Sequence, residues 1–125
     1  MLPLVAASAV LFSACNGEPG AARDGQLPEA LSPAKASVQI EKTFADTKDP
    51  KVKEAAKAAA TALKNRQYDV AYGTLQQLKG SDKLSPAEDM AVRNAIIGIG
   101  ETGAKEAAAG DKKVAEMMRK IRGGP

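Results

Sequence analysis

The side chains of this chain that could take part in chemistry are few in kind. Its 125 residues include no histidine and a single cysteine, Cys15. Zinc sites and the usual nucleophile–base pairs are built from these two residue types, so the inventory excludes both. The carboxylates lie among lysines on expected helices, where surface ion pairs worth about 0.2–0.5 kcal/mol each explain them. They are Glu88, Asp89, Glu101, Glu106 and Glu116. We therefore expect no enzyme, no metal and no cofactor.

A glycine pattern in the second half of the chain suggests one alternative. Residues 98–103 read Gly-Ile-Gly-Glu-Thr-Gly and follow an apolar run, which is similar to the G-x-G-x-x-G of dinucleotide-binding folds. Such a site needs the apolar run to be a strand in a βαβ unit. A capping box that begins at Ser85, a pattern typical of a helix start, precedes this run and favours a helix instead. We interpret the glycines as places where a neighbouring segment can approach, at about 0.8–1.0 kcal/mol each relative to alanine. Whether they bend the helix stays open.

A second motif involves a serine and a lysine. Residues 32–35 read Ser-Pro-Ala-Lys, which is similar to the S-x-x-K of serine penicillin-recognising enzymes, where the lysine helps to activate the serine. Of the companion motifs, residues 81–83 read Ser-Asp-Lys in place of S-D-N, and K-T-G does not occur. A helix cap at Ser32 explains the motif better.

The last expected helix carries the one charge asymmetry of the chain. Five cations stand against Glu116, which gives a local charge of +4 beside a net charge of +3 for the whole chain. The cations are Lys112, Lys113, Arg119, Lys120 and Arg122. They can be a solvated face suited to the negative end of the helix dipole, or a surface for headgroups, cell-wall polymers or an acidic partner. Nucleic acid is not expected, because no aromatic residues interleave the charges.

Helices are expected to position these residues, and the first helical hairpin begins at Asp49-Pro50. The carboxylate can accept free amide protons of the first turn, and proline suits a position that needs no donor. Apolar residues, mostly alanines, then recur every three or four positions. We expect helices over about residues 50–65 and 68–79, with Gly80 as a left-handed C-cap.

The second hairpin has the most specific start signal. Ser85-Pro86-Ala87-Glu88 forms a capping box, in which Ser85 and Glu88 each accept the amide proton of the other. An apolar helical register follows, so we expect helices over about residues 86–109 and 111–122, with a turn at Gly110.

The segment before the first hairpin is ambiguous from its pattern. Residues 33–46 can form a helix that starts at Ser32-Pro33, or a short strand, because Val38, Ile40 and Phe44 share parity. We prefer the helix, since an isolated strand would have no partner. Phe44 is expected to close one end of the core.

The two hairpins resemble tetratricopeptide repeats. In that family a small residue ends the first helix, a tyrosine follows, and an alanine packs the second helix. Tyr68 and Ala71 match this spacing, Gly110 and Ala115 match it in the second hairpin, and Arg66 stands at the first glycine position. The resemblance implies two antiparallel TPR-like hairpins over about 75 residues. Because a solenoid needs three or more repeats, we expect a compact bundle of four to five helices.

The N-terminal residues are typical of an export signal. Residues 1–14 have no charge and precede Cys15. The run is too short to cross a bilayer, which needs about 20 residues, but fits the apolar core of a signal peptide. Phe12-Ser13-Ala14-Cys15 resembles the lipobox of bacterial lipoproteins, which implies cleavage before Cys15 and lipidation of its thiol. The alternative is a buried apolar segment with an incidental cysteine. Asn16 is not the aspartate that resembles an inner-membrane retention signal, so the outer membrane is favoured in a two-membrane cell.

Composition divides the rest of the chain. Residues 15–32 form the lipidated cysteine and a flexible linker with a reach on the order of 20–25 Å. Residues 33–122 form one all-α domain and residues 123–125 a tail. With one cysteine no intrachain disulfide can form.

These observations predict a lipid-anchored helical module of the cell envelope that faces the periplasm and acts by protein–protein contact or scaffolding. Its partners would be the membrane, through lipidated Cys15, and an envelope protein. The alternative is a periplasmic carrier with a small apolar ligand between its helices. An enclosed apolar cavity would favour the carrier, and a filled core with an open groove the scaffold.

Overall fold

The computed structural model describes residues 27–123, and within that range the chain is all-helical. Its five helices are α2 (Pro33–Thr43), α3 (Pro50–Lys64), α4 (Tyr68–Lys79), α5 (Pro86–Ala108) and α6 (Lys112–Gly123). The prediction of a small all-α bundle is confirmed. The ambiguous segment is a helix, which ends at Thr43, earlier than the expected boundary at 46. None of the helices in this range is long and apolar enough to cross a membrane.

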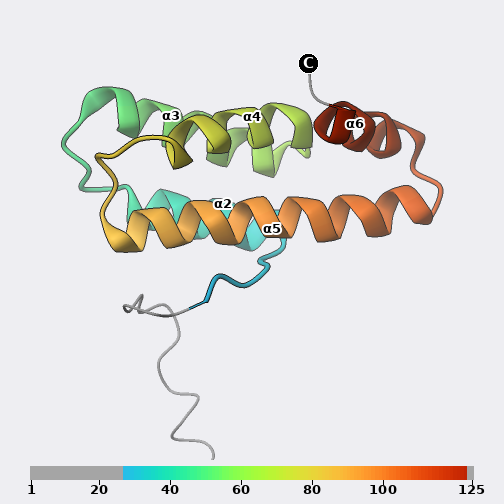
Figure 1. Cartoon of the computed structure of the whole chain (residues 1–125), viewed down its shortest axis with the longest axis horizontal. Coiled ribbons are helices and arrows are strands. Elements are labelled where there is room, and N and C mark those ends of the chain that lie inside the picture. The colour runs from blue at the N-terminus through green and yellow to red at the C-terminus, as the bar shows by residue number, and fades with distance from the viewer. Residues whose placement is uncertain (1–26, 124–125) are drawn as a thin grey trace, which may run out of the picture.

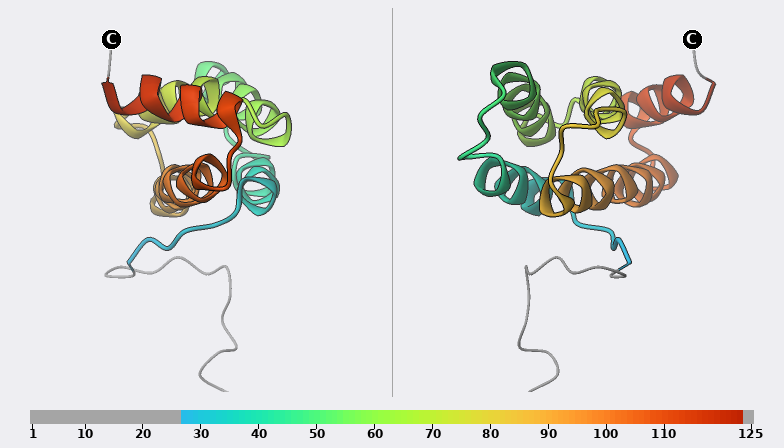
Figure 2. Two further views of the ribbon diagram at one scale, coloured as in Figure 1. Left: turned by 90° about the vertical axis from the view of Figure 1, so that its right-hand side faces the viewer. Right: turned by 60° about the vertical axis from the view of Figure 1, so that its left-hand side comes forward.

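The helices form two layers. α3, α4 and α6 lie in one layer, and α2 and α5 in the other (Figure 1). α2 contacts α3, α3 contacts α4, α4 contacts α5, and α5 contacts α2, so these four helices close a ring. α6 packs on α5 and α4 at one end of the ring (Figure 2).

The tetratricopeptide-like arrangement is not confirmed. Both hairpins are present, since α3 contacts α4 and α5 contacts α6. However, α3 and α5 share no close contact, because α2 packs on both of them. α2 therefore completes a bundle.

Each of the three helices that begin with proline has the cap that the sequence predicts. The Asp49 carboxylate accepts the amide protons of Lys51 and Val52, at 2.9 and 3.1 Å. The Ser85 hydroxyl accepts the Glu88 amide at 3.1 Å, and the Glu88 carboxylate accepts the Ser85 amide at 2.9 Å. Such caps satisfy donors that a helix leaves free at its first turn.

One helix end differs in handedness from the expectation, and two turns have a residue with positive φ. The left-handed conformation predicted for Gly80 is wrong, since its φ is −78°. Gly110, at the α5–α6 turn, does have a positive φ of +106°. Arg66, at the α3–α4 turn, has a φ of +58°. Arg66 thus adopts the backbone conformation that favours glycine.

Small side chains make up most of the buried face of α3. α3 contributes Ala56, Ala59, Ala60 and Ala62, each at most 2 % exposed. Because an alanine face has little depth, neighbouring helices can approach closely. Phe44 is 3 % exposed and closes the core near the α2–α3 loop. At the same end, Asp49 pairs with Lys83 at 2.8 Å, which ties two loops together.

The segment before α2 lies across α5, and we call residues 27–32 the strap. The Glu29 amide donates to Asn94 Oδ1 at 2.8 Å, and the Leu31 amide to the Asn94 carbonyl at 3.4 Å. The strap passes on the outer side of the α2/α5 layer (Figure 1). A Cβ at Gly98 would lie 1.7 Å from the Leu31 carbonyl oxygen, so this crossing requires glycine. The strap falls within the expected linker and is fixed to the domain.

Candidate functional site

The predicted cationic residues lie on the solvent side of α6. The helix buries Val114, Met117 and Met118 against the bundle. Met118 reaches α5 at Gly103, where a Cβ would lie 2.2 Å from the Met118 sulfur. Because this apolar face fixes the rotation of α6, all five cations are exposed. They are Lys112, Lys113, Arg119, Lys120 and Arg122.

Two of the five cations are paired. The Arg119 guanidinium donates to both Glu116 carboxylate oxygens, at 2.5 and 2.6 Å. This hydrogen bond raises the pKa of Arg119 and lowers that of Glu116. Lys120 lies 3.8 Å from the Asp69 carboxylate on α4. Within residues 27–123, the other three cations have no carboxylate within 4.0 Å.

An open groove of about 490 Å³ runs along one flank of α6. Ala107, Ala115 and Met118 give it an apolar lining, and Arg119 and Arg122 stand at its side. A guanidinium presents a planar fork of donors that matches a carboxylate or phosphate. We call Lys112, Lys113, Arg122 and this groove the α6 surface. It combines apolar contact area with exposed positive charge.

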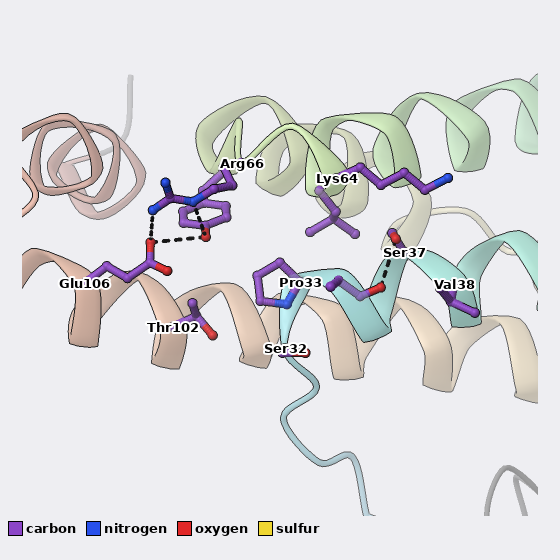
Figure 3. A pocket seen from close by; sticks show the side chains of 11 residues that line it. Ser32, Pro33, Ser37, Val38, Lys64, Arg66, Thr102 and Glu106 are labelled. Carbon is purple, nitrogen blue, oxygen red and sulfur yellow. Dashed lines mark hydrogen bonds and ion pairs between the residues drawn. The ribbon is translucent and has the colours of Figure 1, made fainter.

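A second open groove, of about 590 Å³, lies between the start of α2, the α3–α4 turn and α5. Figure 3 shows its lining, to which Pro33, Ser37 and Val38 contribute from α2 and Thr102 and Glu106 from α5. Its accessible lining is mostly apolar. The groove is open to solvent and lies over a packed core, in which Ser37 is 1 % exposed.

A polar cluster closes one end of the second groove, and we call its four residues, Arg66, Tyr68, Glu106 and Asp111, the clasp. The Arg66 guanidinium donates to the Tyr68 hydroxyl at 3.4 Å, to Glu106 at 2.5 Å and to Asp111 at 3.3 Å. The Tyr68 hydroxyl donates to Glu106 at 3.2 Å. The clasp joins the α3–α4 turn to the far end of α5, so its charges are engaged in holding the fold.

The environment of the clasp shifts three pKa values. Burial raises the pKa of Tyr68. Hydrogen bonds to Tyr68, Glu106 and Asp111 raise the pKa of Arg66. The amide of Val114 lowers the pKa of Asp111, and Arg66 lowers it further. Each shift favours the protonation state that the clasp needs at neutral pH. Sequence reasoning noted Arg66 only as a replaced glycine and missed the cluster.

The structure assigns packing and capping roles to the motifs that suggested chemistry. α5 runs unbroken from Pro86 to Ala108, so the three glycines lie inside one helix. The lack of a Cβ at Gly98 leaves room for the strap, and the lack of one at Gly103 leaves room for Met118. At Gly100 no neighbour requires glycine, because a Cβ there would meet nothing within 4 Å. The Ser32 hydroxyl accepts the Lys35 amide at 3.4 Å, as a helix cap does.

The carboxylates of the described region serve mainly as structural partners. Glu88 belongs to the capping box, Asp89 pairs with Arg93 at 2.7 Å, Glu106 belongs to the clasp and Glu116 pairs with Arg119. Among residues 27–123, no three acidic, histidine or cysteine side chains gather as a metal site would require. Cys15 and the predicted signal peptide lie outside the described residues.

Comparison with protein-family models, with curated proteins and with solved structures finds no match for this chain.

Proposed function

We propose that the chain is a lipid-anchored module of the bacterial cell envelope that acts by contact with another envelope component and not by catalysis. Cys15 would carry the lipid, and the helical domain would present the contact surface. The observation that carries this proposal is the shape of the surface: the two grooves described above are open to solvent and lie over a packed core. A scaffold needs such open surfaces, and a carrier an enclosed cavity.

The α6 surface is the part of the domain best suited to a partner. Its three exposed cations would attract an acidic surface and orient it, an effect that acts mainly on association and falls with ionic strength. The apolar lining of its groove supplies area that a partner can cover. The partner we expect is thus an acidic envelope protein with an exposed apolar group.

Chemical cross-linking of intact envelopes, followed by purification of the chain, tests this proposal. The variant Lys112→Glu/Lys113→Glu/Arg122→Glu should lose most of the partner that the native chain captures. The matched control Lys51→Glu/Lys57→Glu/Lys79→Glu makes the same change of charge on exposed positions of α3 and α4 and should keep it. Equal capture by both variants would contradict the role of α6.

One other candidate, a periplasmic carrier of a small apolar ligand, rests on the size of the second groove and not on its shape, which is open. Its volume of about 590 Å³ lies within the roughly 300–1,000 Å³ typical of small-molecule sites. The exposed residue Ala34 lines this groove, so Ala34→Trp would fill it. A carrier would lose an apolar fluorescent probe on this change, whereas a contact module would retain capture of its partner.

A further inference from the structure

The exposed side of α2, together with the strap, carries a surface that the proposed function has not used. A shallow groove of about 380 Å³ is lined by Leu31 of the strap and by Lys35, Val38, Gln39, Lys42 and Thr43 of α2. It contains two lysines and no carboxylate. Within the described part of the chain, neither lysine has an acidic side chain within 4.0 Å.

The periodicity of α2 places these residues on one outward face. Pro33, Ala36, Ser37 and Ile40 are buried in the bundle. Lys35 and Lys42 are one heptad apart, so they share the opposite side of the helix, about 10 Å apart along its axis. Val38 lies between them and is 54 % exposed. α2 therefore presents an apolar side chain flanked by two cations.

The strap adds apolar surface on the same side of the bundle. Leu27, its first residue, is 81 % exposed. A single exposed apolar residue is ordinary on a protein surface, as Val70 on α4 illustrates at 51 %. Val38 differs from Val70, which follows Asp69 and lacks flanking lysines. We call Leu27, Leu31, Lys35, Val38 and Lys42 the tether face.

The position of the tether face in the chain indicates its occupant. Residues 15–26 connect the predicted lipidated cysteine to Leu27, a stretch of about 12 residues that cannot span more than roughly 40 Å. The strap leads out on the outer side of the α2/α5 layer, whereas α6 lies in the other layer (Figure 2). An anchored domain can therefore rest this face on the lipid, and α6, in the other layer, would then face away from it.

We infer that the tether face rests on anionic phospholipid headgroups, with Lys35 and Lys42 at the phosphates and Val38 and Leu27 in the interface. This inference rests on the proposed lipid anchor, and it adds a fixed orientation to it. Each lysine near an anionic surface strengthens binding about fivefold, which corresponds to about 1 kcal/mol. Two lysines give about 30-fold, a weak contact in free solution that becomes effective once a tether holds the domain nearby.

Vesicle binding of the full-length chain tests the inference without an acyl anchor. Cys15→Ala removes the only thiol and is the background for every variant, so the apolar residues 1–14 contribute equally to each. In this background, binding to vesicles of phosphatidylcholine and phosphatidylglycerol is expected to exceed binding to phosphatidylcholine alone. Lys35→Glu/Lys42→Glu should reduce binding to the anionic vesicles at least about 30-fold, and the control Lys57→Glu/Lys79→Glu should reduce it much less.

A single labelled position reports which face touches the lipid. In the cysteine-free background, Val38→Cys or Lys113→Cys carries an environment-sensitive fluorophore. The label at position 38 should move to an apolar environment on anionic vesicles, and the label at position 113 should stay in water. Insertion through residues 1–14 alone would leave both labels in water and would overturn the inference.

Two other outcomes would also overturn it. Equal binding to neutral and anionic vesicles would remove the role of the lysines. A loss of binding in Lys112→Glu/Lys113→Glu, with none in Lys35→Glu/Lys42→Glu, would assign the headgroup contact to α6. Lipidation itself is measured separately on the native chain by the mass of Cys15, so failure of the tether face and failure of the anchor give different results.

Discussion

α5 is crossed twice, by the strap at Gly98 and by α6 at Gly103, and the two crossings differ in what lies over the glycine. At Gly98 the neighbour is backbone, with the Leu31 carbonyl oxygen 1.7 Å from where a Cβ would stand. At Gly103 the neighbour is the Met118 side chain, with its sulfur at 2.2 Å. Backbone held by hydrogen bonds cannot withdraw, whereas methionine has three rotatable bonds and adapts. The crossing at the strap is therefore rigid, and the crossing at α6 is soft.

The largest effect is expected at the rigid crossing. Gly98→Ala would displace Leu31 and break the hydrogen bonds that Asn94 makes with the strap. We expect a loss of about 1–3 kcal/mol in the free energy of unfolding, together with faster hydrogen exchange at the Glu29 amide. Chemical denaturation and hydrogen-exchange mass spectrometry measure these two effects.

Gly100 is the matched control for Gly98, because a Cβ there would meet nothing within 4 Å. Gly100→Ala should stabilise the chain by about 0.8–1.0 kcal/mol through helix propensity alone. Equal effects of the two substitutions would show that the strap does not lie over Gly98.

A smaller effect is expected at the soft crossing. Gly103→Ala gains helix propensity but crowds Met118, so we expect a net loss of about 1 kcal/mol. In a Met118→Ala background the space is free, and the same substitution should become stabilising. A double-mutant cycle by urea denaturation measures this change of sign. An effect of Gly103→Ala that is the same in both backgrounds would rule out the contact.

The clasp holds the α6 end of the bundle, and Arg66 tests what it contributes. Arg66→Ala removes the hydrogen bonds and leaves a positive φ on a residue with a Cβ, whereas Arg66→Gly removes the bonds and relieves the backbone. Both variants should melt below the native chain, and Arg66→Ala below Arg66→Gly. If the glycine variant were the less stable of the two, residue 66 would not have the left-handed backbone that we describe.

The smallest effect is a dependence on pH. The pKa of Asp111 lies below its ordinary value of 3.8, chiefly because of the Val114 amide. A carboxylate with a lowered pKa in the folded state stabilises it above that ordinary value, and the contribution is lost as pH falls through 3.8 toward the lowered pKa. As the pH is lowered below about 4, the melting temperature of the native chain should therefore decrease. In Asp111→Asn this decrease should be smaller than in the control Asp46→Asn. If the melting temperature of Asp111→Asn depended on pH as that of the native chain does, Asp111 would not be a source of this dependence.

Local signals in the sequence were sufficient to predict the helices and a small bundle, but not which helices pack on one another. Asp49-Pro50 and the Ser85–Glu88 box each contain a complete cap within a few residues, so helix starts could be read directly. The left-handed Arg66 could not be predicted, because its partners Glu106 and Asp111 lie far along the chain and only the fold brings them near. The position of the strap on α5 could not be predicted for the same reason. Asn94, which binds the strap, looks in the sequence like any polar helix residue.

The predicted functional residues divide in the same way. The charge of α6 was visible in the sequence because its cations are close together along the chain, and the buried face of the helix then exposes them. The second groove was not predicted, because it is assembled from α2, the α3–α4 turn and α5. Lys35 was noted only as part of the Ser-Pro-Ala-Lys motif and Lys42 was not noted, because their shared groove with Leu31 forms only when the strap lies beside α2.

The lipid anchor is the central claim, and the mass of the mature N-terminal peptide tests it most directly. Protein recovered from the membrane fraction of the cells that make it should begin at Cys15 and carry the added mass of a thioether-linked diacylglyceryl group. Recovery of the chain free of membranes, with residues 1–14 still attached or with an unmodified Cys15, would contradict the account.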